Sequence, residues 1–596
     1  MTLKIGGTAP NFEVETTDRG EILGVREDGR GRDHRRLSLR RGRGPRLLLV
    51  AIAGAAVMTL AVSPAAAQLA PPQLVKDIFP LENDSDLDEL TAFGDILLFA
   101  ANDGPNGVEL WRSSGTPAGT RLVKDIRPGF INNTDSDPDD FAVMGDFALF
   151  EANDGTHGAE LWRTDGTAAG TLMVKDINEG PAGSAPSSMT AIGGIAYFAA
   201  DDGESGRELW RSDGTAAGTF LIADLWPGET GSAPGEFTEL GAEILLTASA
   251  PGLGEELFKT GGTAGDLELV EDINPGAGGS QLGWLVRLGG AVLFAANDNT
   301  DGFEVWTTDG SGATQVADIN PGAAHSFPNQ LTVAGDEVYF VAEDADGAEL
   351  WRTDGADLTE QVEDINPSGG SFPSWITPFG DSVLFSADDG TNGRELWSTN
   401  GAVPGATLID DISATGSANP TSLSVVEGRV FFAANEGLPV GSELWSTDGT
   451  LGGAELFADI GPNGSSSPQE LTVAGGSLFF QADVEPYGEE LWVALGPDET
   501  NPDTAFTKTP KAKQRLRGQA RKAKARFVLK GSDNRTAAGA LEFECKLDRK
   551  PFRACSKRTR VQVRPGKHVF RARAVDDAGN RDPSPAKFRW RVIRKR

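Results

Sequence analysis

The chain has 596 residues, a net charge of −33 and only two cysteines. A chain of this length can bury one large core or several, and two cysteines exclude a disulfide scaffold for most of it. Its 75 Gly and 87 Asp plus Glu, placed among many short apolar runs, favour an all-β protein with frequent turns.

The charge is unevenly distributed along the chain. Residues 501–596 carry 29 Lys plus Arg against 8 Asp plus Glu, whereas residues 68–500 carry 14 against 72. This asymmetry bears on solubility and on the choice of partners rather than on the fold.

The N-terminal 67 residues precede the part of the chain that has a regular pattern. Residues 1–45 predict an unstructured extension. Residues 46–67 contain an apolar run, Leu47 to Val62, that follows several arginines and ends in Ala65-Ala66-Ala67. This pattern is typical of a secretory signal peptide cleaved after Ala67, with an uncleaved N-terminal anchor as the alternative. We therefore expect a bacterial protein that is secreted or held at the cell surface, with no transmembrane helix once the signal is removed.

Residues 73–495 contain a repeat with a Glu-Leu-Trp motif. Nine copies of the motif or a close variant follow one another at intervals of 45 to 51 residues, which is the length of one four-stranded propeller blade. The fourth copy has Phe258 in place of Trp. The anchors of the other copies are Glu109, Trp111, Glu160, Trp162, Glu208, Trp210, Glu304, Trp306, Glu349, Trp351, Glu395, Trp397, Glu443, Trp445, Glu490 and Trp492.

Each repeat divides into four short runs separated by Asp-Gly or Gly-Asp, which are hairpin signals. The second run is continuously apolar, as in Ile96 to Ala101, and such strands are covered on both faces. The sequence therefore predicts a β-propeller of about nine four-stranded blades, with eight as the fallback because nine exceeds the usual range.

The two ends of the repeat region complement each other. The last motif, at Trp492, has no fourth strand after it, and the first repeat is preceded by an extra fourth strand that contains Leu74, Val75, Asp77 and Ile78. Transfer of that strand to the last blade closes the ring and leaves no unpaired edge.

The repeated residues are better explained by structure than by chemistry. A catalytic acid or base is needed once per site rather than once per blade, so we interpret the Glu as a hydrogen-bond acceptor and the Trp as wedge packing between blades. Carbohydrate stacking by the Trp rings is the alternative. His-based triads and phosphate-binding loops are missing, so we expect no enzymatic activity, although the sequence leaves the question open.

Two loops carry alternate carboxylates that resemble the donor sets of calcium sites. A solvated acidic loop is the competing interpretation, because neither loop has the Gly that an EF-hand turn requires. Calcium is the only cofactor that the sequence suggests. The residues concerned are Asp84, Asp86, Asp88, Asp135, Asp137 and Asp139.

The basic C-terminal part divides into a linker, residues 496–525, and a small β-sandwich, residues 526–596, in which apolar residues alternate with Arg and Lys. Cys545 and Cys555 flank a turn and predict a hairpin disulfide. The basic side chains predict attachment to anionic envelope polymers. The simpler alternatives are a solubilising surface or docking on the chain's own acidic propeller. Few aromatic residues accompany them, which argues against base stacking and sequence-specific nucleic-acid binding.

Two resemblances follow from these motifs. Residues 73–495, with "ELWRTDGTAAGT" and "ELWRSDGTAAGT", resemble the ELWxxDGT repeat proteins of bacteria, which implies export and repetition but no chemistry. The tail, "FECKLDRKPFRAC" onward, is similar to bacterial immunoglobulin-like or fibronectin-like modules.

Taken together, the motifs predict a monomeric, non-enzymatic binding or cell-surface interaction module with an unknown ligand at the propeller mouth, where loops converge. The tail would tether it to anionic envelope polymers. The alternative is an extracellular polysaccharide hydrolase or lyase that uses unrepeated carboxylates at that mouth.

Overall fold

The structure is a computed structural model of the chain. It describes residues 2–3, 12–16, 22–27, 69–80, 83–129, 135–402, 404–462, 464–496, 502–516, 521–532, 541–576 and 580–594. The described residues form strands and no helix, which confirms the all-β class. The expected signal peptide, residues 46–67, lies outside them. The chain separates into two compact units, Met1–Pro64 and Ala65–Arg596.

The N-terminal unit contains a small antiparallel sheet. Its strands are β1 (Thr2–Leu3), β2 (Phe12–Thr16) and β3 (Ile22–Glu27), in the order β1-β2-β3. The prediction that residues 1–45 are unstructured is therefore wrong for these residues. The reason is local, because aromatic and β-branched residues alternate with polar ones in β2, as strands prefer.

Most of the described residues of the second unit form nine four-stranded antiparallel sheets. The first strands are β5 (Asp88–Phe93), β9 (Asp139–Val143), β13 (Ser187–Ile192), β17 (Gly235–Leu240), β21 (Gly283–Leu288), β25 (Asn329–Ala334), β29 (Ser374–Phe379), β33 (Thr421–Val426) and β37 (Gln469–Ala474). The second strands are β6 (Ile96–Asn102), β10 (Ala148–Asn153), β14 (Ile195–Asp201), β18 (Glu243–Ala250), β22 (Ala291–Asn297), β26 (Glu337–Asp344), β30 (Ser382–Asp388), β34 (Arg429–Asn435) and β38 (Ser477–Val484).

The third strands carry the Glu-Leu-Trp motif. They are β7 (Val108–Ser113), β11 (Ala159–Thr164), β15 (Arg207–Ser212), β19 (Gly254–Thr260), β23 (Phe303–Thr308), β27 (Gly347–Thr353), β31 (Arg394–Thr399), β35 (Ser442–Thr447) and β39 (Gly488–Ala494). The fourth strands are β8 (Arg121–Lys124), β12 (Leu172–Lys175), β16 (Phe220–Ala223), β20 (Glu268–Glu271), β24 (Ala313–Ala317), β28 (Thr359–Glu363), β32 (Ala406–Asp410), β36 (Ala454–Ala458) and β4 (Gln73–Lys76).

Tight turns join the first and second strands. In the sheet that begins with β5, Phe93 pairs with Ile96 across the two-residue loop Gly94-Asp95. Gly94 has a φ of 58°, a conformation that glycine adopts without the steric penalty of a side chain. The Gly-Asp signal in the sequence therefore marks a two-residue hairpin.

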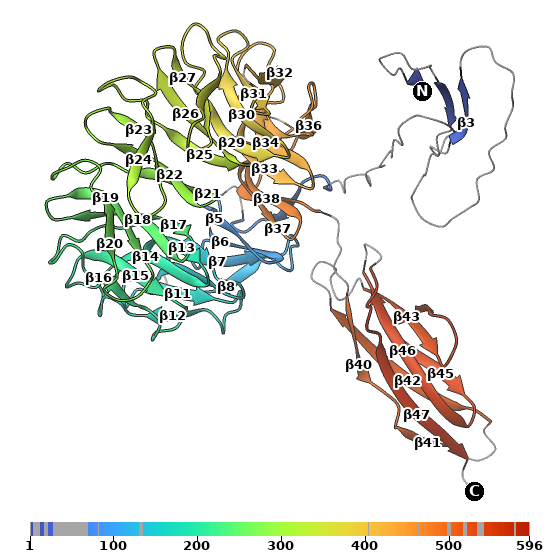
Figure 1. The fold of residues 1–596 in the computed structure, drawn as a ribbon. Helices are drawn as coiled ribbons and strands as arrows, with labels where there is room; N and C mark the ends of the chain where they lie inside the picture. Colours follow the sequence, from blue (N-terminus) through green and yellow to red (C-terminus); the bar gives the residue numbers. More distant parts are fainter. Residues whose placement is uncertain are drawn as a thin grey trace, which may run out of the picture. The chain divides into compact units, whose positions relative to one another are not determined.

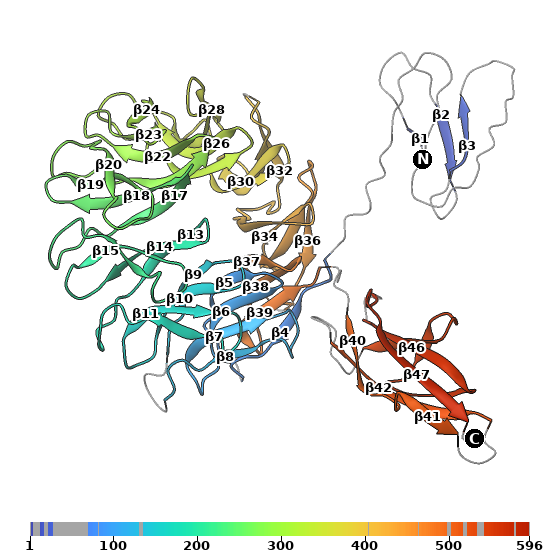
Figure 2. The same ribbon diagram turned by 60° about the horizontal axis from the view of Figure 1, so that its bottom comes forward.

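The sheets follow one another around a common axis (Figures 1 and 2). The first strand of each sheet contacts the first strand of the next, and β37 contacts β5. The second strands are buried on both faces, as Leu97 to Ala101 of β6 show. The apolar clusters lie between adjacent sheets, for example where Phe99 and Trp111 meet Phe479 and Val493. This arrangement is a β-propeller.

The last sheet contains a strand from the beginning of the repeat region. Strand β4 pairs with β39, with Leu74 opposite Trp492, so the sheet has the order β37-β38-β39-β4. Val75 lies within β4, and Asp77 and Ile78 follow it directly. This is the pairing that the two incomplete ends of the repeat predict.

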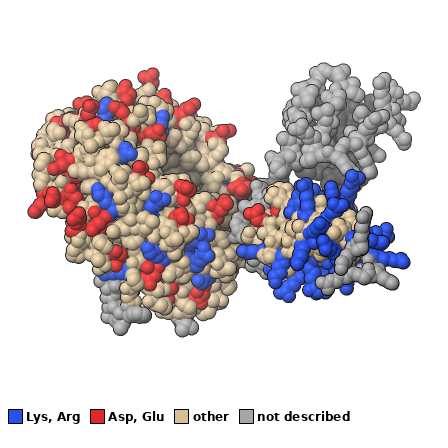
Figure 3. Space-filling model, turned by 90° about the horizontal axis from the view of Figure 1, so that it is seen from below, with Lys and Arg blue, Asp and Glu red and all other residues tan. Residues whose placement is uncertain are grey.

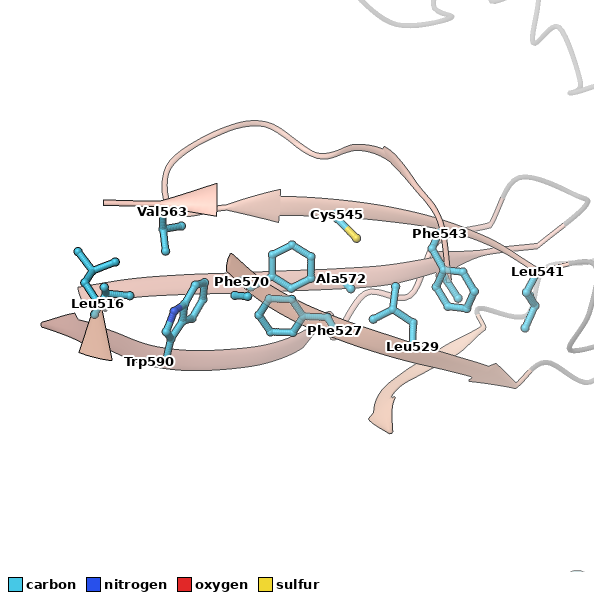
Figure 4. Packing of buried hydrophobic residues seen from close by; sticks show 13 residues of the cluster. Leu516, Phe527, Leu529, Leu541, Phe543, Cys545, Val563, Phe570, Ala572 and Trp590 are labelled. Carbon is cyan, nitrogen blue, oxygen red and sulfur yellow. The ribbon is translucent and has the colours of Figure 1, made fainter. Parts of the chain in front are cut away.

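The C-terminal part is a sandwich of a three-stranded and a five-stranded sheet, in the orders β40-β42-β45 and β41-β47-β46-β43-β44. The aromatic rings of Phe527, Phe570 and Trp590 pack in its core (Figure 4). A disulfide joins Cys545 to Cys555, as predicted. The strands are β40 (Asp503–Lys508), β41 (Lys513–Leu516), β42 (Ala523–Ser532), β43 (Glu542–Leu547), β44 (Arg553–Cys555), β45 (Arg558–Val563), β46 (Gly566–Val575) and β47 (Ala586–Arg594).

The prediction of a basic linker over residues 496–525 is wrong for much of that segment. Strand β40 pairs with β42, and β41 pairs in parallel with β47. The Phe506 ring lies 5.6 Å from the Phe527 ring, measured between centroids. The strands were missed because only Phe506 and Leu516 contribute large apolar side chains to the core, and the neighbouring Lys and Arg obscure the alternation.

Candidate functional site

The anchor Glu side chains of the third strands join neighbouring sheets. The Glu109 carboxylate accepts hydrogen bonds from the backbone N–H groups of Ile126 (2.8 Å) and Arg127 (3.0 Å). It also accepts one from the Ser136 hydroxyl (2.7 Å), at the start of the next sheet. Glu490 does the same with Ile78, Phe79 and Ser85. All nine anchor Glu residues are buried, and their hydrogen bonds indicate a structural role.

Burial changes the titration of these carboxyl groups. It raises the pKa of four anchors to about 7, against the effect of the hydrogen bonds that they accept. These four are Glu109, Glu304, Glu395 and Glu490. The pKa values of Glu160, Glu208, Glu256, Glu349 and Glu443 are raised by burial as well.

The anchor Trp side chains pack between sheets. Lys76 Nζ lies 4.7 Å from the centroid of the Trp111 ring, and Lys124 Nζ lies 5.0 Å from that of Trp162, at distances typical of cation–π contacts. Trp111, Trp162, Trp210, Trp306 and Trp445 are buried, and Trp351, Trp397 and Trp492 are half-buried. The anchors therefore offer little surface to a ligand.

The six Asp residues considered as calcium ligands lie beside the first strands of two sheets. Asp84 accepts a hydrogen bond from Glu489 N (2.9 Å), and Asp135 accepts one from Val108 N (2.8 Å). Asp86 accepts one from the Asn102 amide. Among the described residues, no group of three or more His, Cys, Asp or Glu side chains is arranged to hold a metal ion.

A second repeated position lies on the first strands, around the axis. At the same place in every first strand, a residue other than glycine has a φ between 51° and 61°. This conformation is unfavourable for such residues and is imposed by the surrounding structure. The nine residues are Glu89, Asp140, Ser188, Glu236, Trp284, Gln330, Trp375, Ser422 and Glu470. The backbone conformation is thus the same at this position in every first strand, whereas the side chain differs from sheet to sheet.

Two cavities lie along these first strands. One, of about 860 Å³, is lined by Glu89, Trp375, Ser422 and Glu470 together with neighbouring residues of their strands. The other, of about 540 Å³, is lined by Trp284, Trp375 and residues of β25. Both volumes are within the range of ligand sites, and Trp375 lines both cavities. This axial region is the candidate site of the protein.

The side chains at the axis form two arcs of different chemistry. In the acidic arc, Glu89, Asp140, Glu236 and Glu470 come from β5, β9, β17 and β37. The aromatic arc comes from β21 and β29. Its exposed rings are Trp284 and Trp375.

Two further carboxyl groups, those of Asp139 and Glu151, lie next to the acidic arc. Glu151 of β10 stands opposite Asp139 of β9, and Glu89 of the neighbouring sheet is near enough to Asp139 for their charges to interact. Burial, followed by the charge of Asp139, raises the pKa of both Glu89 and Glu151 to about 7. Arg207 of the next sheet opposes this shift at Glu151. We did not identify Glu151 from the sequence, although it interrupts the apolar second strand of its repeat.

Some side chains of this axial position also connect neighbouring first strands. The Asp140 carboxylate accepts a hydrogen bond from Met189 N (2.8 Å), and Gln330 Oε1 accepts one from Trp375 N (2.9 Å). Trp284, Trp375 and Ser422 make no such bond through their side chains in the described structure. In the described part of the chain, the two Trp side chains are therefore not engaged in hydrogen bonds that hold neighbouring first strands together.

Four-stranded sheets around an axis, with ligand-sized cavities along their first strands, define this chain as a β-propeller with a candidate axial binding site. No family model and no curated protein matches the chain. Solved structures similar to it include a puromycin hydrolase (14% identity, 58% of each chain, TM-score 0.31) and prolyl endopeptidases (10% identity, 61% of this chain and 54% of that one, TM-score 0.36). The β-propeller domain of the Trilobed protease from Pyrococcus furiosus is also similar (12% identity, 55% of this chain and 98% of that one, TM-score 0.29).

The match spans little more than half the length of the two hydrolases. The propeller assignment rests on the pairing of this chain's own strands. A search of the described residues finds no helix with the length and apolar character needed to span a membrane.

Proposed function

We propose that this protein is an exported propeller of nine blades that binds a polysaccharide at its axis. Its C-terminal immunoglobulin-like sandwich would attach it to anionic polymers of the cell envelope. The observation that carries the proposal is the exposure of Trp284 (48%) and Trp375 (45%) beside the axial cavities. The other ten Trp side chains of the protein are buried or half-buried.

The lining of the smaller cavity suits a sugar. A pyranose ring has an apolar C–H face, which stacks on a flat indole, and a rim of hydroxyl groups, which need hydrogen-bond partners. Trp284 and Trp375 supply the indoles, while Asn329, Gln330 and Ser374 supply amide and hydroxyl groups. The hydrogen bond from Trp375 N to Gln330 Oε1 holds the backbone of one indole in place, which limits the entropy lost on binding.

Export and surface attachment rest on the sequence. The pattern of residues 46–67 is typical of a signal peptide, and the repeat resembles a family of exported proteins. The basic sandwich supplies the charge that an anionic polymer would need.

A polysaccharide hydrolase or lyase is the second candidate, favoured by the group Glu89, Asp139 and Glu151. Glycoside hydrolysis uses two carboxyl groups, of which one is protonated and the other ionised. Glu89 and Glu151, with pKa values of about 7, are suited to carry a proton at neutral pH. Asp139, which lies between them, supplies the second carboxyl group.

The test is a binding and turnover assay of the full chain with a panel of bacterial envelope polysaccharides. We expect at least one of them to bind without being cleaved. Trp284→Ala combined with Trp375→Ala should weaken that binding by about tenfold or more, because each stacked ring contributes about 1 kcal/mol. Tyr487→Ala, which removes an exposed ring outside both cavities, should leave binding unchanged.

The same assay separates the two candidates. Release of new chain ends that is abolished by Glu89→Gln or Glu151→Gln would replace the binding module with a hydrolase or lyase. No binding to any polysaccharide, or equal binding by the Trp variant and wild type, would contradict the axial site. Parallel measurements with and without calcium test whether the loops around Asp86 and Asp137 take part.

A further inference from the structure

The exposed face of the five-stranded sheet in the C-terminal sandwich carries rows of positive charge. Strand pairing places Lys513, Arg591 and Lys567 side by side across β41, β47 and β46. All three side chains are exposed. We call them the first row. Figure 3 shows Lys and Arg spread over much of the visible surface of the sandwich.

A second row lies on the same face. Lys587 of β47 pairs with Arg571 of β46, which pairs with Lys546 of β43. Lys587 is exposed, and the other two side chains are half-buried. The two rows together form what we call the cationic face.

The described sandwich has few ion pairs. Glu544 pairs with Arg573 and Arg581, and Asp548 pairs with His568. No ion pair of the described residues involves either row. Like charges directly opposite each other on neighbouring strands destabilise a sheet. A surface needed for solubility alone has no use for such rows, because interspersed charges of both signs serve that purpose at lower cost.

We propose that the cationic face binds a phosphodiester polymer lengthwise, through its charges and not its sequence. This inference rests on the tethering role proposed above and assigns it a surface and a ligand class. Successive outward side chains of β47, such as Lys587, Arg589 and Arg591, stand about 7 Å apart, and neighbouring strands about 5 Å apart. A flexible phosphodiester chain places its phosphates at comparable steps, so one chain contacts several cations in register.

The lack of stacking platforms favours phosphodiesters over acidic polysaccharides. Among the described residues, the only cation–π contact of the cationic face is with Phe552, which lies 4.3 Å from Lys546 Nζ and 4.3 Å from the neighbouring Arg573 guanidinium. It is therefore covered by the protein's own cations. A sugar polymer would find no free ring on which to stack, whereas phosphates need only charge and N–H donors.

The test measures binding of the full chain to poly(glycerol phosphate), to a thymidine oligonucleotide with an equal number of phosphates, and to polygalacturonate. We expect the two phosphodiester polymers to bind with equal affinity per phosphate and the polyuronate to bind at least tenfold more weakly. The logarithm of the binding constant should fall linearly with the logarithm of the salt concentration, because bound counterions are released. Preference for the oligonucleotide alone would identify nucleic acid as the source of the ligand, and preference for poly(glycerol phosphate) would identify a wall polymer.

Two charge-matched variants locate the surface. Lys513→Gln, Lys567→Gln and Arg591→Gln together remove the first row. Lys524→Gln, Arg526→Gln and Arg560→Gln together remove three exposed charges from the three-stranded sheet. The first variant should bind at least tenfold more weakly at low salt and lower the salt slope by about 2, because each lost contact removes about 0.7. The second should change affinity by less than about threefold.

Equal losses in the two variants would overturn the proposal, because net charge alone would then explain binding. Tighter binding to polygalacturonate, or binding only to vesicles of anionic lipid, would also overturn it. Polysaccharide binding at the propeller axis is measured on the same variants and should be unchanged. If the wild-type chain binds polysaccharide at its axis but no phosphodiester polymer, this inference alone is refuted. If it binds the phosphodiester polymer but no polysaccharide, only the axial site is refuted.

Discussion

The ring of sheets and the C-terminal sandwich place their charged side chains in opposite ways. In the ring, the repeated carboxyl groups are buried, and each, like Glu109, accepts hydrogen bonds from its own sheet and the next one. In the sandwich, the interior is apolar and the repeated charges, such as Lys513 and Arg591, point outward. A repeated charge whose partners come from the fold stabilises the fold. A repeated charge without such partners is better explained by binding to a ligand.

The largest effect is expected from opening the ring. Deletion of residues 70–80 removes β4. It also removes the backbone N–H groups of Ile78 and Phe79, which donate hydrogen bonds to the Glu490 carboxylate. It also removes the buried side chains of Val75 and Ile78. We expect the free energy of unfolding of the ring to fall by about 4 kcal/mol or more, measured by thermal or denaturant unfolding.

A milder pair of variants controls for the deletion. Val75→Ala, at a buried position of β4, should destabilise the ring by about 1–3 kcal/mol. Val425→Ala, at an exposed position of β33, should have little effect. An unchanged unfolding transition after the deletion would contradict closure by β4.

The second expected effect is a loss of stability in the sandwich that leaves the ring unchanged. Replacement of Cys545 and Cys555 by Ala opens a short disulfide loop, which should destabilise the sandwich by about 2–3 kcal/mol on the chain-entropy model. The unfolding transition of the ring should stay in place. Calorimetry that resolves two transitions checks both statements, and a shift of the ring transition would contradict the independence of the two parts.

A smaller effect is expected from a single anchor. In Glu109→Gln, one carboxylate oxygen becomes an N–H₂ group, so one of the three donors from Ile126, Arg127 and Ser136 loses its acceptor. The cost should be about 1–3 kcal/mol. Glu204→Gln, at an exposed turn position, is the control and should be neutral. Equal stability of the two variants would show that the anchor carboxylate does not hold the sheets together.

The last expected effect is a pH dependence that differs between the two parts. Burial raises the pKa of Glu109, Glu304, Glu395 and Glu490 to about 7 in the folded ring, well above the value of about 4.3 in an unfolded chain. The folded ring thus binds more protons, and its stability should fall as the pH rises from about 5 to about 8. Among the described residues, the buried Glu side chains belong to the ring alone, so the transition temperature of the sandwich should change less over this range. A ring that gains stability with rising pH would contradict the assignment.

Local sequence patterns predicted the four-stranded sheets, but they did not predict the residues of the candidate site. The Gly-Asp turns and apolar second strands predicted the four-stranded sheets, and the incomplete repeat at Trp492 predicted the pairing with β4. Strands β40 and β41 were missed because Lys and Arg outnumber their few apolar residues. Trp284 and Trp375 were not singled out, since nothing in the sequence distinguishes an exposed Trp of a first strand from a buried one of a third strand.

The sequence by itself determined which stretches become strands and how each sheet folds, because periodicity and turn chemistry act over a few residues and repeat with each unit. Only the tertiary structure decided which side chains meet around the axis. Glu89 and Asp139 are 50 residues apart in the chain, and they are neighbours only because the first strands of successive sheets pack against each other. The aromatic and acidic arcs arise for the same reason, since a ring brings one residue from each repeat to a common centre.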